Sequence, residues 1–224
     1  MPTAFTVLSA TPHLCHSCSG PHPTLVRAWR GSELLLEPEG THFSYTIDGA
    51  ALLQTSAGHF PLGPGMYASF ADGVVHGAGS GLVVTRLGVR GLFQLGGPLE
   101  AKGRLRYIDG CTDSLLVSPP LRGDPCLNHL HIPAGTRQTR HTHPSVRVGV
   151  IARGQGRCVT PEGEHPLYTG LVFVIAADAL HAFFTDEASL DVVVYHPDSD
   201  TGPTHEDHPM INRTLVERAG SGPS

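Results

Sequence analysis

The sequence repeats itself with a shift of 105 residues, and this internal repeat constrains the fold more than any other feature. In each copy a glycine is followed eleven residues later by a histidine, and a strand-like apolar run lies between them. The matched positions, which align without a gap, are Gly49 with Gly154, Pro61 with Pro166, Leu62 with Leu167, Gly65 with Gly170, and His76 with His181. The repeat predicts two copies of one structural unit in a single chain.

The composition favours an all-β chain. The sequence holds 27 glycines and 19 prolines, only 16% of its residues are charged, and its apolar runs are short. This pattern is typical of many brief strands joined by turns. We expect two sandwiches of roughly six to eight strands each, which would cover most strand edges. The expected parts are a flexible N-terminal segment (1–23), a first half (24–100), a second half (101–198) and a polar C-terminal tail (199–224).

The charge balance excludes some classes of partner. The formal net charge is −5 and the sequence pI is near 6.3, so the chain lacks the basic footprint of a nucleic-acid-binding protein. No apolar run approaches the ~20 residues that a membrane-spanning helix needs. We therefore expect a small-molecule substrate as partner, with neither nucleic acid nor a membrane.

The N-terminal sequence and the cysteines bear on the cellular location of the protein. The N-terminus has neither the basic stretch nor the long apolar core of a secretory signal. Five cysteines form an odd and scattered set, which favours reduced thiols over a disulfide framework. Both features favour a cytoplasmic location. We expect a monomer or a homodimer there.

Two closely spaced histidines stand out in the second copy. His141 and His143 lie two residues apart in a run that we expect to be a strand. Alternate residues of a strand share one face, so both imidazoles can bind the same metal ion. The surrounding frame reads Gly135, five residues, His-x-His, three residues, Arg147, six residues, Gly154.

This frame resembles the first motif of the cupin superfamily, which has glutamate at the place of Arg147. The run from Gly170 to His181 resembles the second cupin motif, in which a strand after a tight glycine turn carries a histidine to the site. The resemblance covers roughly residues 24–198. It implies a bicupin, an all-β chain with two jelly-roll β-barrels.

The resemblance also implies a metal centre. In cupins the two motifs lie on neighbouring strands, so His141, His143 and His181 are expected to converge inside the second barrel. Neutral imidazole suits several divalent transition metals. We expect one divalent ion, Fe²⁺, with Zn²⁺, Mn²⁺ or Ni²⁺ as alternatives. The competing interpretation is that the three are surface histidines or buried histidines with ordinary hydrogen-bond partners.

Arg147 replaces the residue that is a fourth ligand in most cupins. A guanidinium stays protonated and has no acceptor, so it cannot bind a metal ion. Its rigid fork matches carboxylate, phosphate or enolate oxygens. One interpretation is that Arg147 holds an anionic substrate at the metal and takes part in catalysis. The other is that it pairs with an acid such as Asp186 or Glu187.

The first half lacks the histidine pair. Leu36 and Pro38 stand where His141 and His143 would be expected, and His42 stands at the place of Arg147. His42 and His76 could form a partial second site with help from Glu37 or Glu39. We expect instead a structural half without metal.

Two further residues are candidates for the site. His129 and His131 alternate along one predicted strand, so they share a face. His129 could act as an acid or base in the pocket, or both histidines could lie between the two halves. Phe183 shares the face of His181 and could form an apolar substrate-binding wall, although packing alone would also explain it.

These features predict a metal-dependent cupin enzyme that acts on a small, anionic or oxygen-rich molecule. Three-histidine cupins resembling this pattern include thiol dioxygenases and diketone-cleaving dioxygenases, which use mononuclear non-haem Fe(II). A first alternative is an isomerase, cyclase or lyase with Zn, Mn or Ni as Lewis acid. A second alternative is a cupin that binds a small molecule without converting it.

Overall fold

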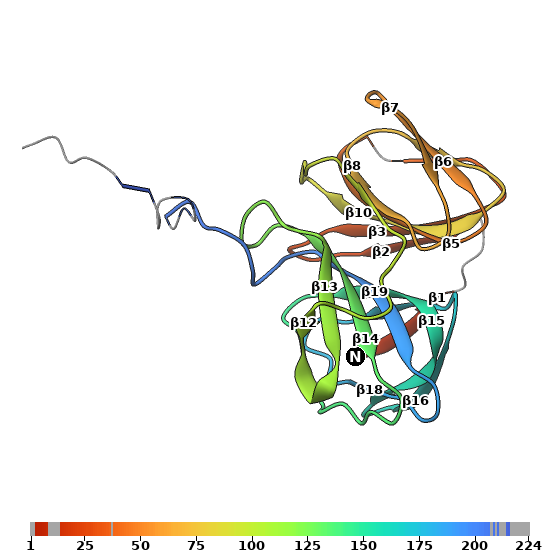
Figure 1. The fold of residues 1–224 in the computed structure, drawn as a ribbon, viewed down its shortest axis with the longest axis vertical. Helices are drawn as coiled ribbons and strands as arrows, with labels where there is room; N and C mark the ends of the chain where they lie inside the picture. The colour runs from red at the N-terminus through yellow and green to blue at the C-terminus, as the bar shows by residue number, and fades with distance from the viewer. Residues whose placement is uncertain are drawn as a thin grey trace, which may run out of the picture.

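The computed structural model describes residues 3–8, 14–36, 38–206, 208, 210 and 214–215. Figure 1 shows two β-barrel-like halves stacked on each other, with the first half in orange and yellow and the second in green and blue. The only helical element in the described part of the chain is one short 3₁₀ turn, Ile108–Gly110. The expected all-β class is confirmed.

The first half consists of two sheets. Its six-stranded sheet has the order β11-β8-β5-β10-β3-β2, and its four-stranded sheet has the order β4-β9-β6-β7. The strands are β2 (Cys15–Cys18), β3 (Thr24–Arg30), β4 (Leu34–Leu35), β5 (Gly40–Asp48), β6 (Ala51–Thr55), β7 (Gly58–Leu62), β8 (Tyr67–Phe70), β9 (Val74–His76), β10 (Ser80–Leu87) and β11 (Gln94–Gly96).

The second half is built on one long sheet. Its order is β1-β17-β15-β19-β14-β13-β12, and β16 and β18 pair with the far part of β15 to form the facing layer. The strands are β1 (Phe5–Leu8), β12 (Leu105–Arg106), β13 (Thr112–Val117), β14 (Cys126–Ile132), β15 (Arg147–Thr160), β16 (Gly163–Tyr168), β17 (Val172–Ile175), β18 (Ala182–Phe184) and β19 (Leu190–His196).

The N-terminal segment is more ordered than we expected. β1 pairs with β17 and so completes the sheet of the second half, while β2 pairs with β3 of the first half. In Figure 1 the red β1 lies within the lower, second half. The expectation of a flexible segment over residues 1–23 is therefore wrong for its described part, 3–8 and 14–23. The remaining domain boundaries stay predictions, and most of the tail beyond residue 206 lies outside the described residues.

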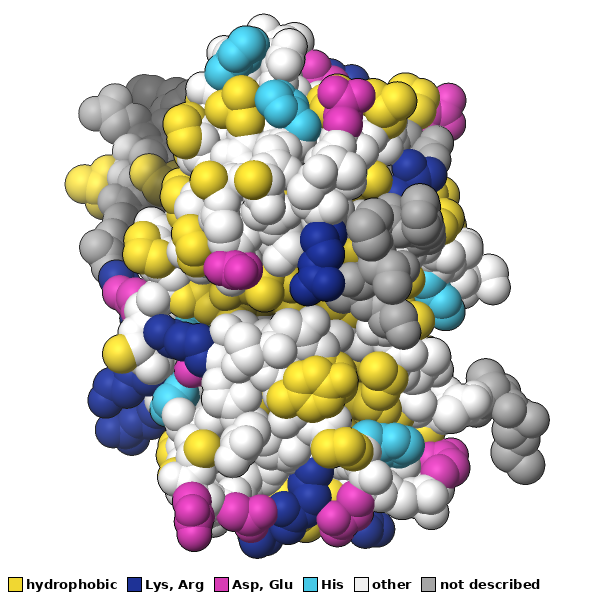
Figure 2. Space-filling model, turned by 90° about the vertical axis from the view of Figure 1, so that its right-hand side faces the viewer, with side chains coloured by type: hydrophobic (Ala, Val, Ile, Leu, Met, Phe, Trp, Pro, Cys, Tyr) yellow, Lys and Arg dark blue, Asp and Glu magenta, His cyan; other side chains and the backbone are white. Residues whose placement is uncertain are grey.

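Three apolar clusters hold the molecule together. One fills the first half, one fills the second, and a third lies between the two large sheets. Strand alternation divides the side chains among them: on β19, Val192 and Val194 enter the second-half core, whereas Val193 and Tyr195 join the cluster between the halves. Figure 2 shows apolar side chains along this junction on one face of the molecule.

The sequence repeat is real but changes register near its end. His42 pairs with Phe70 and Arg147 pairs with Ile175, so the shift of 105 holds for these strands. The shift fails at His76. This residue pairs with Leu52, whose counterpart in the second half is Arg157. Arg157, however, pairs with Phe184. The loop before β18 is three residues longer than the loop before β9. His76 therefore corresponds to Phe184, and the expected match with His181 is wrong.

Two further expectations concern the cysteines and membrane-spanning helices. All five cysteines are free, and three of them are buried. No helix in the described ranges combines the length and the apolar character that a membrane crossing requires.

Candidate metal centre

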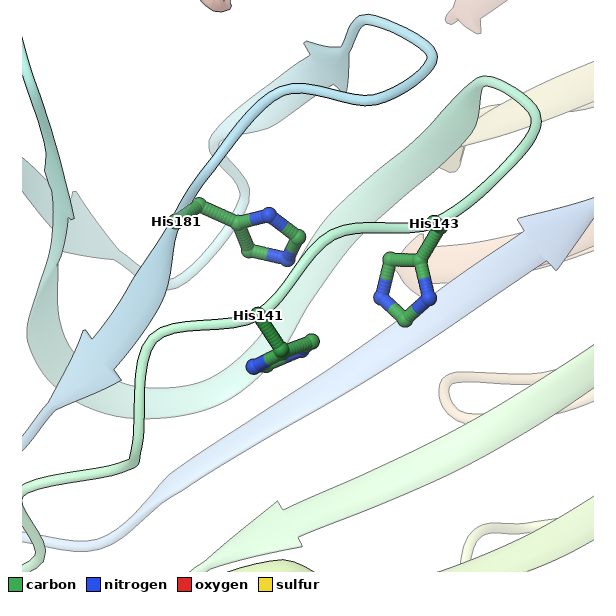
Figure 3. A group of neighbouring side chains, drawn as sticks. All are labelled: His141, His143 and His181. Carbon is green, nitrogen blue, oxygen red and sulfur yellow. The ribbon is translucent and has the colours of Figure 1, made fainter.

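The three histidines lie on two irregular segments that are joined by backbone hydrogen bonds. His141 and His143 belong to the loop between β14 and β15, not to a strand as we expected, and His181 immediately precedes β18. The backbone N–H groups of His141 and His181 each donate to the carbonyl of the other, at 3.0 Å. The carbonyl of His143 accepts from the N–H of Asp178 at 2.7 Å. These bonds hold the two segments side by side (Figure 3).

The three side chains are close enough to share an ion. One potential ligand atom from each of His141, His143 and His181 lies within 4.8 Å of the others. The ring centroids are 4.6 Å apart for His141 and His181, and 5.0 Å apart for His141 and His143. The cluster predicted from the sequence is therefore present.

Backbone carbonyls fix the tautomer of two of the rings. Nδ1 of His141 lies 2.9 Å from the carbonyl oxygen of Thr139, and Nδ1 of His181 lies 2.9 Å from that of Ala179. A carbonyl oxygen only accepts, so each Nδ1 must carry the proton and donate it. Each Nε2 then presents its lone pair, which is the usual arrangement of metal-binding histidines.

The surroundings keep His143 and His181 neutral. Burial, together with the positive charge of Arg147, lowers the pKa of His143 to about 3. Burial likewise lowers the pKa of His181 to about 4. Metal binding requires neutral imidazole. The donor atoms, tautomers and protonation states thus fit a divalent transition-metal ion.

The cluster opens into a cavity of about 270 Å³. Its walls are mostly apolar, and a Cβ at Gly149 would lie 2.2 Å from Cζ of Phe173, so this glycine makes room for the ring that forms one wall. The apolar lining residues are Leu105, Leu115, Leu130, Phe173, Ile175, Phe183 and Val194. The polar ones, besides the three histidines, are Arg106, Tyr107, Asp113, Asn128, Arg147, His196 and Thr201.

Arg147 lies at this cavity but is only partly paired. Its Nη1 donates to the carbonyl and hydroxyl oxygens of Ser145, at 3.1 and 2.5 Å, and lies 3.8 Å from a carboxylate oxygen of Asp198. Its Nε is buried and has no partner among the described residues. The acid beside Arg147 is therefore Asp198, whereas Asp186 pairs with Arg137 and Arg157 on the surface.

His129 does not lie in the cavity. It is fully buried on the opposite face of β14, and its Nε2 lies 2.8 Å from Asp191. His131 and Arg153 contact the same carboxylate, at 2.9 and 3.1 Å. The position between the halves, one of our two interpretations, is thus the observed one. The suggestion that His129 acts as an acid or base in the pocket is wrong in its placement.

Phe183 does line the cavity. It lies edge-on against His181, with ring centroids 5.8 Å apart. Its role in substrate binding stays a prediction.

Sequence reasoning missed six polar residues of the cavity, and three of them, His196, Asp113 and Asn128, are central to its chemistry. His196, the last residue of β19, lies with its ring centroid 6.4 Å from that of His143. Asp113 and Asn128 lie on neighbouring strands, and Nδ2 of Asn128 donates to Oδ1 of Asp113 at 2.9 Å. Alternation is the signal that could have found His196, because it shares the inward face of β19 with Val192 and Val194.

The first half offers no comparable group in the part of the chain that is described. His42 is fully buried, and its Nδ1 lies 2.8 Å from the hydroxyl of Thr85. Glu37, one of the acids that we considered as helpers, lies outside the described residues. A second site built on His42 and His76 is not formed there.

Solved structures share this architecture at low sequence identity. A cupin 2 conserved barrel domain protein from Leptotrichia buccalis matches with a TM-score of 0.59 and 12% identity, over 84% of this chain and 91% of that one. A salicylate 1,2-dioxygenase from Pseudaminobacter salicylatoxidans matches with a TM-score of 0.58 and 10% identity, over 81% and 75% of the two chains. The chain has the cupin fold.

A third structure agrees. AerE from Microcystis aeruginosa matches with a TM-score of 0.55 and 13% identity, over 86% of this chain and 96% of that one. No protein-family model and no curated protein matches the sequence. Since the matches span both halves, the bicupin architecture predicted from the sequence is confirmed, and at these identities the likeness concerns the fold.

Proposed function

We propose that this bicupin is a metal-dependent enzyme acting on a small anionic molecule, and that it is a mononuclear non-haem Fe(II) dioxygenase. One observation carries the proposal: three histidines converge at the wall of a mostly apolar cavity that also holds a partly unpaired arginine. This combination offers a metal, a charge for an anion and a dry space for a reaction.

In this proposal His141, His143 and His181 hold the ion through one nitrogen each. A ferrous ion there would supply open coordination positions for substrate and dioxygen. The chain's own contribution is orientation. The hydrogen bonds from His141 and His181 to backbone carbonyls keep both rings turned toward the cavity.

Arg147 binds the anionic group of the substrate. Ser145 and Asp198 hold its Nη1, so the guanidinium is oriented before a ligand arrives. The apolar wall that includes Phe173 and Phe183 keeps bulk water away, which strengthens the attraction between Arg147 and an anion. The fold shared with a salicylate 1,2-dioxygenase supports this choice of reaction class, with no inference about that enzyme's substrate.

The test begins with elemental analysis of protein purified without a polyhistidine tag. The protein is then loaded anaerobically with Fe(II) and screened against small carboxylates for substrate-dependent O₂ uptake. We expect uptake that His141→Ala abolishes. Arg147→Gln should raise KM about 10- to 100-fold, the range for a lost hydrogen bond to a charged group. Activity or ligand binding that persists fully in metal-free His141→Ala and His181→Ala proteins would contradict the proposal.

A second candidate is non-redox chemistry, an isomerase, cyclase or lyase with Zn, Mn or Ni as Lewis acid. Asp113 favours it, because burial raises the pKa of this cavity carboxyl to about 6, where it can both give and take a proton. Conversion of a substrate without O₂ uptake would identify this class. Binding without any conversion would identify a non-catalytic cupin.

A further inference from the structure

Asp113 is an unusual acid for its surroundings. It lies on β13 and lines the cavity among Leu105, Leu115 and Leu130. Its side chain has one hydrogen-bond partner, Asn128, and forms no salt bridge with any described residue. The chain packs closely over it, since a Cβ at Gly103 would lie 2.5 Å from the backbone nitrogen of Asp113.

Asp191 shows how the same protein treats a buried acid that is structural. Three basic side chains contact Asp191, and it lies on the outward face of β19 between the halves. Burial alone would raise its pKa, but hydrogen bonds from His129, His131 and Arg153 lower it overall. Asp113 has no such neutralising partners. A carboxyl that lies at the wall of a cavity without an ion-pair partner is typical of a group that reacts with a ligand.

Asn128 explains how Asp113 would be held. Its amide donates to Oδ1 of the carboxyl, so this bond fixes one oxygen and restricts the rotation of the group. The other titratable side chains near Asp113 are Arg106, Tyr107 and Arg147, which line the same cavity, and Cys126 and His129, both on β14. None of these five forms a hydrogen bond or an ion pair with Asp113 in the described structure. Asp113 thus remains the acid of the cavity that is free to exchange a proton.

We infer that Asp113 is the proton-transferring residue of this site, that Asn128 is its positioning residue, and that the substrate carries an acidic C–H or O–H beside its anionic group. The inference rests on the proposed metal site. In the forward step the carboxylate of Asp113 takes the proton and becomes a neutral carboxylic acid, while the electron pair of the broken bond stays on the substrate as an enolate or alkoxide. In the reverse step Asp113 returns the proton, so no oxidant or reductant is consumed.

The test uses a probe that has each required feature. 2-Oxo-4-phenylbutanoate carries a carboxylate, an oxo group that a metal can polarise, acidic hydrogens on carbon 3, and an apolar ring. Zinc-loaded full-length protein is incubated with the probe in D₂O, and deuterium at carbon 3 is followed by NMR. We expect wild-type protein to catalyse exchange. Asp113→Asn should lose at least about 100-fold of this rate, the lower range for a positioned acid or base.

Two further variants separate positioning from general disruption. Asn128→Ala should lower the rate less than Asp113→Asn does and should shift the pH midpoint of exchange. Asp124→Asn, at a half-buried loop position that does not line the cavity, should leave rate and pH profile unchanged. Zinc content is measured on every sample. Zinc-containing wild-type protein that catalyses no exchange, or an Asp113→Asn protein that exchanges as fast as wild type, would overturn the inference and leave the metal site intact. Wild-type protein that binds no zinc or iron would overturn the proposed function itself.

Discussion

The two halves share one strand framework, but among the described residues only the second half surrounds a cavity with metal-binding potential. His42 and Arg147 occupy matching positions, opposite Phe70 and Ile175 respectively. In the first half, His42 packs against Phe70 with ring centroids 5.2 Å apart, and it is fully buried. In the second half, the guanidinium of Arg147 lies at the cavity.

Two local differences account for this contrast. The first is the loop before β18, which is three residues longer than its counterpart before β9 and which places His181 beside His141. The second is Trp29, a fully buried side chain in the first-half core. A Cβ at Gly81 on β10 would lie 1.9 Å from its ring, so only a glycine at this position leaves room for the indole. Together with Leu36 and Pro38 in place of the histidine pair, these two differences distinguish the second half, which could hold a metal ion, from the first.

The largest expected effect comes from removing the histidines that distinguish the second half. His141→Ala and His181→Ala should each lower the affinity for Zn²⁺ or Fe²⁺ by more than about 100-fold, because loss of even an outer partner of a ligand typically costs about 10- to 100-fold. Metal content by elemental analysis and titration calorimetry would measure this. His76→Ala in the first half is the matched control and should bind one metal ion per chain, the stoichiometry that we also expect of wild type. Equal losses in all three variants would contradict the assignment of the site to the second half.

Trp29→Ala tests whether the packed side chain of Trp29 fills the core of the first half without any role in metal binding. Removing a fully buried tryptophan should lower the free energy of unfolding by about 3–5 kcal/mol, since it leaves a cavity in a packed core. Denaturant unfolding measures the change, and Leu35→Ala, at a site 64% exposed, should change stability by less than about 0.5 kcal/mol. Metal stoichiometry should stay at the wild-type value. A metal content that falls with Trp29→Ala would show that the halves do not act independently.

Much of this contrast could be predicted from the sequence. The repeat indicated two similar halves, and the missing histidines at Leu36 and Pro38 indicated which half lacks the site. The same repeat gave the wrong partner for His181, because both loops happen to end near a histidine and only the strand ladder reveals the insertion. Sequence similarity without structural register cannot detect such a shift.

Other features depended on long-range pairing. β1 pairs with a strand more than 160 residues away, and nothing in Phe5–Leu8 itself indicates that partner. Asp113 was missed for a related reason, because its place at the cavity depends on which face of β13 turns inward. The alternation of residues around His141 predicts a strand, yet this segment forms a single bridge with His181 in an otherwise irregular loop.

Asp113→Asn should change stability less than Trp29→Ala does, and in the opposite direction. It sharpens the contrast between the halves because, among the described residues, the buried ones of the first half include no acid. Burial raises the pKa of Asp113 in the folded state to about 6, above its ordinary value of 3.8, so the folded state binds more protons than the unfolded state between these values. Stability then falls as the pH rises toward 6. At pH 7 the variant should be more stable than wild type by about 1–3 kcal/mol, allowing for partial solvent screening. The difference should disappear below about pH 4.

Urea unfolding at pH 7 and pH 4 measures this dependence. Asp191→Asn is the matched control with the opposite sign, because its pKa is lowered in the folded state and its charge contributes stability at neutral pH. An Asp113→Asn protein that is less stable than wild type at pH 7 would mean that the carboxylate is held by partners, as Asp191 is.

The smallest effect is expected at His129, which joins the halves and does not line the cavity. His129→Gln removes one of three basic contacts to Asp191, while those from His131 and Arg153 remain. Stability should therefore fall by only about 1 kcal/mol, the net value of one hydrogen bond. Metal content and the pH profile of any activity should match wild type, because the side chain faces the first half across the core between the two sheets. If His129→Gln instead removed a titration step from the pH profile of activity, protons would have to pass between the two faces of β14. That result would contradict our assignment of His129 to the contact between the halves and not to the cavity.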